Sequence, residues 1–115
     1  MKKIYYLSTC STCNRIIKEL GLDNSFEYQD IKTNKITVPQ IEEMAKMSGS
    51  YESLFSRRAM KYKALGLGNQ TLSEDDYKKY ILEEYTFLKR PVIIIDNNIF
   101  VGNSAKTIEA ASKKL

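Results

Sequence analysis

The residues of this chain best suited to chemistry are its two cysteines, which stand three positions apart as Cys10-Ser11-Thr12-Cys13. The sequence contains no histidine, which excludes Ser-His-Asp and Cys-His catalysis and every metal site that needs an imidazole. Two thiols alone cannot complete a four-ligand zinc site, so we expect no bound metal. Any nucleophile must come from Cys, Asp, Glu, Lys, Tyr, Ser or Thr, and the cysteine pair indicates thiol chemistry.

The cysteine pair lies between a predicted strand and a predicted helix. Ile4-Tyr5-Tyr6-Leu7 is a short β-branched and aromatic run, which is typical of a buried strand. The residues that follow recur at the spacing of one helix face: Cys13, Ile16, Ile17 and Leu20. Because free N–H groups at a helix N-terminus favour an anion, we expect Cys10 to be the exposed, low-pKa nucleophile. Cys13 would be buried and would resolve the mixed disulfide. Two incidental core cysteines are the alternative.

The remaining patterns predict strands and helices in an α/β order. Predicted strands span residues 3–7, 26–31, 90–95 and 99–101. Further helices are predicted to begin at the capping box Thr37-Val38-Pro39-Gln40, at Ser73 and after Gly102, with short helices over residues 54–65. The strand, helix and strand of the first thirty residues predict a βαβ unit with parallel strands, and the last two strands predict a hairpin.

The composition is that of one globular domain. The chain has 115 residues, of which 43% are hydrophobic and 28% charged, with a net charge of +4. The lysines occur in pairs without a long basic block, so nucleic-acid binding is not expected. Eight tyrosines could form a stacking platform for bases, but their helical spacing favours core packing. No apolar run approaches the roughly 20 residues of a membrane span, and no secretory signal is recognisable. We therefore expect a soluble, cytoplasmic protein without membrane contact.

Arg90-Pro91 precedes the β-branched run Val92-Ile93-Ile94-Ile95. A proline that opens a strand can be held as a cis peptide beside a redox site. It can equally be a simple marker of the strand start. The sequence leaves both interpretations open.

Together these motifs resemble those of the ArsC/Spx family of thioredoxin-fold proteins. The resemblance covers nearly the whole length and rests on four strings: Cys10-Ser11-Thr12-Cys13, Tyr62-Lys63-Ala64-Leu65-Gly66-Leu67, Leu88-Lys89-Arg90-Pro91-Val92-Ile93-Ile94 and Val101-Gly102. It implies an α/β, thioredoxin-like fold with a four-stranded mixed sheet in the order 2-1-3-4. It also implies flanking helices, a helical insertion over about residues 37–88 within a single domain 1–115, and a cis Pro91.

In the glutaredoxin-coupled arsenate reductases of this family, one cysteine at the position of Cys10 attacks arsenate, and three arginines surround the oxyanion. Here Arg90 matches, whereas Ser56 and Gly102 occupy the other two positions. Each missing arginine removes roughly 1.5–3 kcal/mol of charge-assisted binding. The basic residues available to replace them are Arg15, Arg57 and Arg58.

Spx-type regulators form a second branch, which binds the RNA polymerase α-subunit and uses the cysteine pair as a disulfide switch. Gly49 and Arg58 resemble residues of that branch. Small ArsC-like proteins form a third group, which resembles this chain most and shares its Gly102 and Arg58. That group is thought to consist of thiol oxidoreductases that use glutathione.

The resemblance and the residues together predict a thiol–disulfide oxidoreductase with Cys10 as nucleophile and Cys13 as resolving thiol. Glutathione or another thiol would be the co-substrate, glutaredoxin or thioredoxin would be partners, and no cofactor would be bound. The expected substrate or oxyanion-binding residues are Arg90, Pro91, Arg58, Thr12 and Arg15. A redox-switched regulator that binds the RNA polymerase α-subunit and a glutaredoxin-coupled arsenate reductase are the alternatives.

Overall fold

The computed structural model describes all residues, 1–115, and divides them into two compact units. Met1–Lys35 and Arg90–Leu115 form the first, here called the sheet unit. Ile36–Lys89 forms the second, called the helical unit, whose bounds lie within one residue of the predicted insertion. That the whole chain is one domain stays a prediction.

The sheet unit is built on four short strands: β1 (Lys2–Tyr6), β2 (Glu27–Asp30), β3 (Val92–Ile95) and β4 (Asn98–Val101). Their order in the sheet is β2-β1-β3-β4, which confirms the predicted order. β1 runs parallel to β2 and antiparallel to β3, and β3 and β4 form the predicted antiparallel hairpin. Asp96 opens the hairpin turn with φ of 55°, a left-handed conformation that Asp adopts more readily than most residues.

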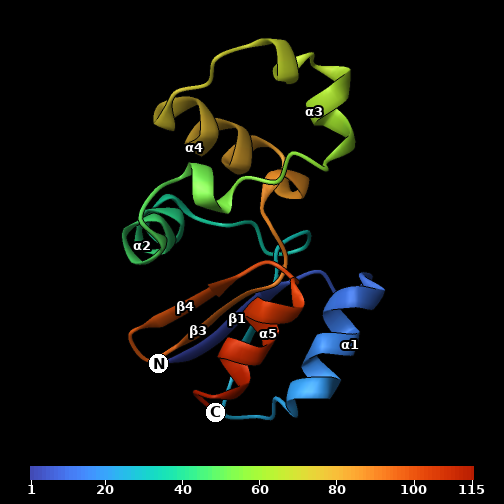
Figure 1. Cartoon of the computed structure of the whole chain (residues 1–115), viewed down its shortest axis with the longest axis vertical. Helices are drawn as coiled ribbons and strands as arrows, with labels where there is room; N and C mark the ends of the chain where they lie inside the picture. The colour runs from blue at the N-terminus through green and yellow to red at the C-terminus, as the bar shows by residue number, and fades with distance from the viewer. The chain divides into compact units, whose positions relative to one another are not determined.

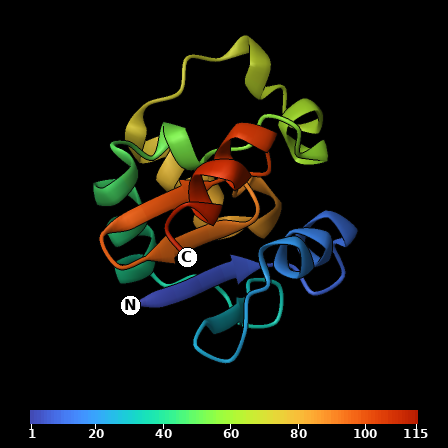
Figure 2. The ribbon, with the colours of Figure 1, turned by 60° about the horizontal axis from the view of Figure 1, so that its bottom comes forward.

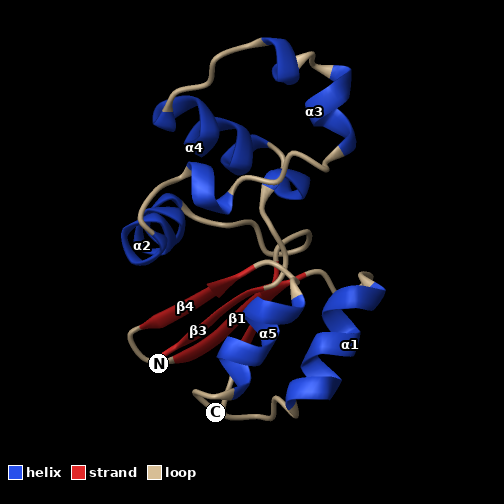
Figure 3. Ribbon diagram, in the orientation of Figure 1, coloured by secondary structure: helices blue, strands red, loops and turns tan.

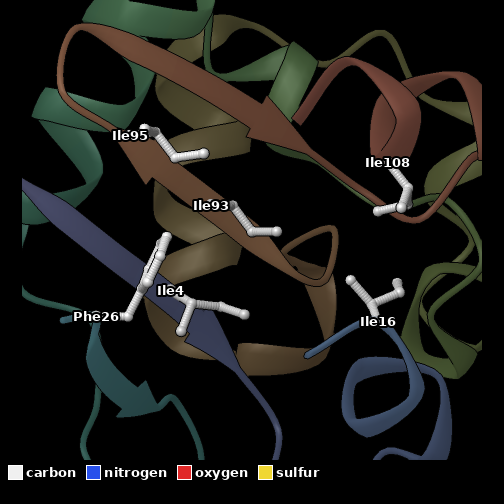
Figure 4. Close-up of a cluster of buried hydrophobic side chains, with 6 residues drawn as sticks. All are labelled: Ile4, Ile16, Phe26, Ile93, Ile95 and Ile108. Carbon is white, nitrogen blue, oxygen red and sulfur yellow. The ribbon is translucent and has the colours of Figure 1, made fainter. Parts of the chain in front are cut away.

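Two helices, α1 (Ser11–Leu20) and α5 (Ala105–Ser112), lie side by side against the sheet of this unit (Figures 1 and 3). The helices and strands share a core whose members are at most 8% exposed: Ile4, Ile16, Phe26, Ile93, Ile95 and Ile108 (Figure 4). Burying each isoleucine stabilises the unit by roughly 1.5–3 kcal/mol. This packing fixes α1, the helix that carries the cysteines, against β1 and β3.

Two details of the sheet unit differ from the simple alternation and periodicity of the sequence. Gln29 is 4% exposed and Tyr28 is 38% exposed, although the alternation favours the tyrosine as the buried residue. β2 is an edge strand, so Tyr28 packs edge-on against Tyr6 while the Gln29 amide donates to the Asn34 carbonyl. Leu115 has the helical spacing of Ile108 and Ala111, but it lies beyond the end of α5 and is 51% exposed.

The helical unit contains helices and loops but no strand (Figure 3). Its α-helices are α2 (Val38–Ser48), α3 (Met60–Ala64) and α4 (Glu74–Glu83), with 3₁₀ helices at Glu52–Leu54, Leu67–Asn69 and Tyr85–Phe87. Thr37 with Gln40 and Ser73 with Asp76 form the two capping boxes, which confirms both predicted helix starts. No helix in the structure is long and apolar enough to span a membrane.

The aromatic side chains of the helical unit form a core rather than an exposed platform. The Phe55 ring stacks on Phe87 at 5.0 Å and packs against Tyr77 at 4.9 Å between ring centroids. Phe55, Phe87 and Tyr77 are all buried. Tyr85 continues the helical spacing of Tyr77 and Ile81, but it belongs to the following 3₁₀ helix because Glu84 is extended and ends α4.

Candidate active site

β1 leads through a short turn into α1 (Figure 2), and Cys10 is the last residue before that helix. The Cys10 backbone N–H donates to the Leu7 carbonyl at 3.0 Å, and the Cys10 carbonyl accepts from the Asn14 N–H at 3.1 Å. Cys10 is therefore the N-cap residue of α1, with extended backbone angles, and its sulfur lies at the helix end where N–H groups are unpaired. At the other end, Gly21 adopts the left-handed conformation and stops the helix.

The two thiols differ in burial and in acidity. Cys10 is half-buried, and Cys13, one turn along α1, is completely buried. Burial opposes ionisation of Cys10, but the N–H and thiol of Cys13, the N–H of Thr12 and the charge of Arg90 together lower its pKa below the ordinary value. Burial raises the pKa of Cys13 to about 11, and its interaction with the Cys10 sulfur adds to that rise. Cys10 is therefore the more acidic thiol of the pair, and Cys13 is the less acidic one.

Arg90 reaches the cysteines through strand pairing, although it stands 80 positions after Cys10 in the sequence. Val92 pairs with Tyr5 in the antiparallel register, so the chain that enters β3 lies at the end of β1 that leads to Cys10. The positive charge of Arg90 lowers the pKa of both cysteines. The Arg90–Pro91 peptide bond is cis, as the resemblance implies. The Pro91 carbonyl accepts from the Gly102 N–H at 2.9 Å.

The other predicted site residues fall in different places. Thr12 lies in the first turn of α1 and its N–H interacts with the Cys10 sulfur. Arg15 is exposed on the same helix. Arg57 and Arg58 belong to the helical unit, where the Arg57 guanidinium donates to Glu52 at 2.8 Å and to the Tyr77 hydroxyl at 3.1 Å.

The structure thus brings five of the predicted site residues together in the sheet unit: Cys10, Thr12, Cys13, Arg90 and Pro91. The side chain of Arg57 is already bound to a carboxylate and a hydroxyl. Arg58 is exposed, and its only hydrogen bond is from its backbone N–H to the Ser56 hydroxyl. A role for Arg58 or Arg15 in substrate binding stays a prediction. No group of three or more His, Cys, Asp or Glu side chains is placed to hold a metal ion.

Three polar residues that interact around the turn before Cys10 were not predicted from the sequence. The Ser8 hydroxyl donates to the Asp30 carboxylate, and the Asn14 side-chain amide donates to the Ser8 carbonyl at 2.9 Å. Asp30 ends β2, Ser8 follows β1 and Asn14 lies in α1. Only the parallel pairing of β1 with β2 brings Ser8 and Asp30 together, and no spacing in the sequence indicates that contact.

The sequence model of the ArsC family matches residues 5–111, which is nearly the whole chain. The chain belongs to the ArsC family. The match begins in β1, includes the cysteine turn and both units, and ends within α5. Family membership therefore applies to the segment that holds Cys10 and Cys13 as well as to the Arg90-Pro91 segment.

Individual ArsC-family relatives are distant in sequence and close in fold. The chain is 24% identical over 106 residues to the global transcriptional regulator Spx 2 of Bacillus anthracis, a match over 89% of this chain and 79% of the relative. An ArsC-family-related protein of Bacteroides fragilis superposes with a TM-score of 0.79 at 22% identity, over 95% of both chains. A possible arsenate reductase of Streptococcus mutans superposes with a TM-score of 0.73 at 26% identity, over 96% of this chain and 97% of the other. These likenesses establish the ArsC-type, thioredoxin-like fold.

Proposed function

We propose that this ArsC-family protein is a thiol–disulfide oxidoreductase that uses Cys10 as its nucleophile and Cys13 as its resolving thiol. The observation that carries the proposal is the placement of the two thiols: Cys10 is half-buried at the N-cap of α1, and Cys13 is completely buried one helical turn along. A thiolate is the species that attacks a disulfide, and a second thiol beside it can release the product. Small thiols such as glutathione are the proposed co-substrate, in the reducing cytoplasm that the sequence predicts as the location.

The proposed reaction is two successive thiol–disulfide exchanges. The Cys10 thiolate attacks one sulfur of a substrate disulfide, forms a mixed disulfide with it and expels the other half as a thiolate. Cys13 then gives up its proton and attacks the Cys10 sulfur, which expels the remaining half and leaves the Cys10–Cys13 disulfide. The substrate has gained two electrons. Two glutathione thiols, or one dithiol of glutaredoxin or thioredoxin, return the electrons and restore both thiols.

Burial explains the division of labour between the two cysteines. Cys13 is inaccessible to a substrate, so it cannot make the first attack. It lies beside the Cys10 sulfur, so it can attack a mixed disulfide formed there. A substrate with a negative charge would gain from Arg90, which lies close enough to stabilise the Cys10 thiolate.

Arsenate reduction is a weaker interpretation because of the residues at two positions where the arsenate reductases carry arginine. Ser56 is half-buried and accepts from the Arg58 N–H. Gly102 has φ of 91°, and its N–H is already bound to the Pro91 carbonyl. Neither residue supplies a cation for a dianion. The observation in favour of this activity is the similarity to structures of proteins described as arsenate reductases, among them the possible arsenate reductase of Streptococcus mutans.

A redox-switched regulator is the second candidate, and the similarity to Spx 2 of Bacillus anthracis favours it. Under this alternative the same Cys10–Cys13 disulfide would form, but it would change binding to the RNA polymerase α-subunit instead of passing electrons to a substrate. Both candidates therefore need the same thiol pair. They differ in whether the protein reduces a substrate catalytically.

A coupled assay separates the three candidates. Purified protein is mixed with glutathione, glutathione reductase, NADPH and a glutathionylated peptide, and NADPH consumption is followed. We expect turnover that is lost in Cys10→Ser. Parallel arms replace the peptide with arsenate plus glutaredoxin, or test capture of the RNA polymerase α-subunit by the reduced and oxidised protein. Turnover only with arsenate, or redox-dependent capture without any turnover, would overturn the proposal.

A further inference from the structure

We propose that Asn14 and Asp30 are positioning residues that hold the Ser8–Cys10 turn, and with it the Cys10 sulfur, at the N-terminus of α1. The inference rests on the proposed function, since it assumes that Cys10 is the reacting thiol. Neither residue interacts with the sulfur in the way that Thr12, Cys13 and Arg90 do. Both act through Ser8.

Ser8 is held on two sides. Its hydroxyl donates to Oδ2 of Asp30, and its carbonyl accepts from Nδ2 of Asn14 at 2.9 Å. The first bond ties the turn to the end of β2, and the second ties it to the first part of α1. Two residues later, the Cys10 N–H is bonded to the Leu7 carbonyl. The short stretch from Leu7 to Cys10 is thus anchored to β2 and α1 in addition to the strand that precedes it.

Asp30 is itself fixed in place. Its Oδ1 accepts from the Lys32 N–H at 3.1 Å, and its backbone carbonyl accepts from the Asn34 N–H at 2.8 Å. The hydrogen bond from the Ser8 hydroxyl lowers the pKa of the Asp30 carboxyl and so favours its ionised form. The carboxylate is therefore a rigid acceptor at the end of β2 and not a mobile surface charge.

The position of the turn matters because the stabilisation of the Cys10 thiolate is local. Backbone N–H groups act on a charge only over the first turn of a helix, and the N–H groups of Thr12 and Cys13 belong to that turn. If the turn moved away, the sulfur would lose these donors while burial still opposed its charge. Loss of either anchor should then raise the Cys10 pKa without touching any group that contacts the sulfur.

Asn14→Ala and Asp30→Ala test the two anchors. Alanine is the strongest helix former, so Asn14→Ala removes the donor while favouring α1. Asp30→Asn is the conservative variant, because the amide oxygen can still accept from Ser8 although the charge is gone. Asp23→Ala is the matched control: Asp23 accepts from the Ser25 hydroxyl at 2.6 Å and lies before β2, at the end away from Ser8.

The measurement is the rate of alkylation of Cys10, identified by mass spectrometry, with unfolding in urea as a parallel readout. At about pH 6 we expect Asn14→Ala and Asp30→Ala to react about threefold or more slowly than the unsubstituted protein, since the rate follows the thiolate fraction. At about pH 10 the difference should vanish, because every variant is then ionised. Asp30→Asn and Asp23→Ala should keep the rate of the unsubstituted protein at both pH values.

Each other outcome contradicts the inference. Equal rates at low pH for all variants would mean that the anchors do not position Cys10. An equal loss in Asp30→Asn would mean that the charge of Asp30 acts and not its hydrogen bond. An equal loss of alkylation rate in Asp23→Ala would mean that the slower reaction reflects general destabilisation of the fold. If the unsubstituted protein itself reacts no faster than a free cysteine at low pH, both the proposed function and the inference fail. If it reacts faster and the variants match it, only the inference fails.

Discussion

Cys13 lies one helical turn from Cys10 on α1, and the interaction between their sulfurs moves the two pKa values apart. The Cys13 thiol and N–H lower the pKa of Cys10, whereas the Cys10 sulfur adds to the effect of burial and raises the pKa of Cys13. Cys10 is therefore the more acidic of the two thiols. In the proposed reaction Cys10 is the thiol that attacks, and Cys13 is the thiol that resolves the mixed disulfide.

The first prediction concerns the pH dependence of alkylation. Because the Cys10 pKa is lowered, its thiolate fraction persists as pH falls below the ordinary cysteine value, and it is lost only below the depressed pKa. Cys13 should stay unmodified until pH approaches its pKa of about 11. Mass spectrometry after short exposure to iodoacetamide checks both. Equal modification of Cys10 and Cys13 at neutral pH would contradict the assignment of Cys10 as the more reactive thiol. Cys10→Ser is the control, because Cys13 is then the only thiol that can be modified.

Arg90 should act on Cys10 through its charge. Arg90→Ala removes a cation that lowers the Cys10 pKa, so the alkylation rate at about pH 6 should fall by about threefold to tenfold. Arg90→Lys should retain much of the rate, because the charge remains. Lys89→Ala, a change of the exposed neighbouring cation, is the control. A similar loss in Lys89→Ala, or no loss in Arg90→Ala, would show that Arg90 does not stabilise the thiolate.

Gly102 should resist replacement by any residue with a side chain. Its φ of 91° is strained for L-residues, so Gly102→Ala should lower the free energy of unfolding by about 1–2 kcal/mol. Gly68 lacks a positive φ, and a methyl group there would meet Tyr62 at 3.7 Å, an ordinary contact. Urea denaturation should therefore show a larger loss for Gly102→Ala than for Gly68→Ala. The reverse order would mean that the backbone at residue 102 is free to relax.

The core of the sheet unit should depend on β3 more than on β4. Ile93 is 1% exposed and belongs to the cluster that packs β1, β3, α1 and α5 together. Ile93→Ala should lower the free energy of unfolding by about 2–5 kcal/mol. Ile99 is half-buried on the edge strand β4, so Ile99→Ala should cost clearly less. Equal losses in urea denaturation would contradict this distribution of the core.

Local signals in the sequence predicted three of the helices, including α1, which carries the cysteines. The run Cys13, Ile16, Ile17 and Leu20 followed by Gly21 predicted α1, and the capping boxes at Thr37 and Ser73 predicted the starts of α2 and α4. Each of these signals acts over a few residues, so composition and spacing are enough to reveal it. The position of Cys10 before a helix follows from the same local pattern.

Contacts between distant segments were predictable only in part. The strand order and the cis Arg90–Pro91 bond came from the family resemblance and not from periodicity. The Ser8–Asp30 hydrogen bond joins residues 22 positions apart, and it depends on a parallel register that no short pattern encodes. Gln29 is buried and Tyr28 is exposed, and this reversal likewise depends on the position of β2 at the sheet edge.

Trapping the reaction of Cys10 with glutathione disulfide tests the central claim most directly. In Cys13→Ser, the mixed disulfide between Cys10 and glutathione should accumulate, because nothing can resolve it. In the unsubstituted protein the same treatment should yield the Cys10–Cys13 disulfide, with a reduction potential in the range of catalytic dithiols, roughly −270 to −120 mV. Mass spectrometry after thiol capping distinguishes the two products. A stable mixed disulfide in the unsubstituted protein, with no Cys10–Cys13 bond, would show that Cys13 does not resolve and would contradict the account.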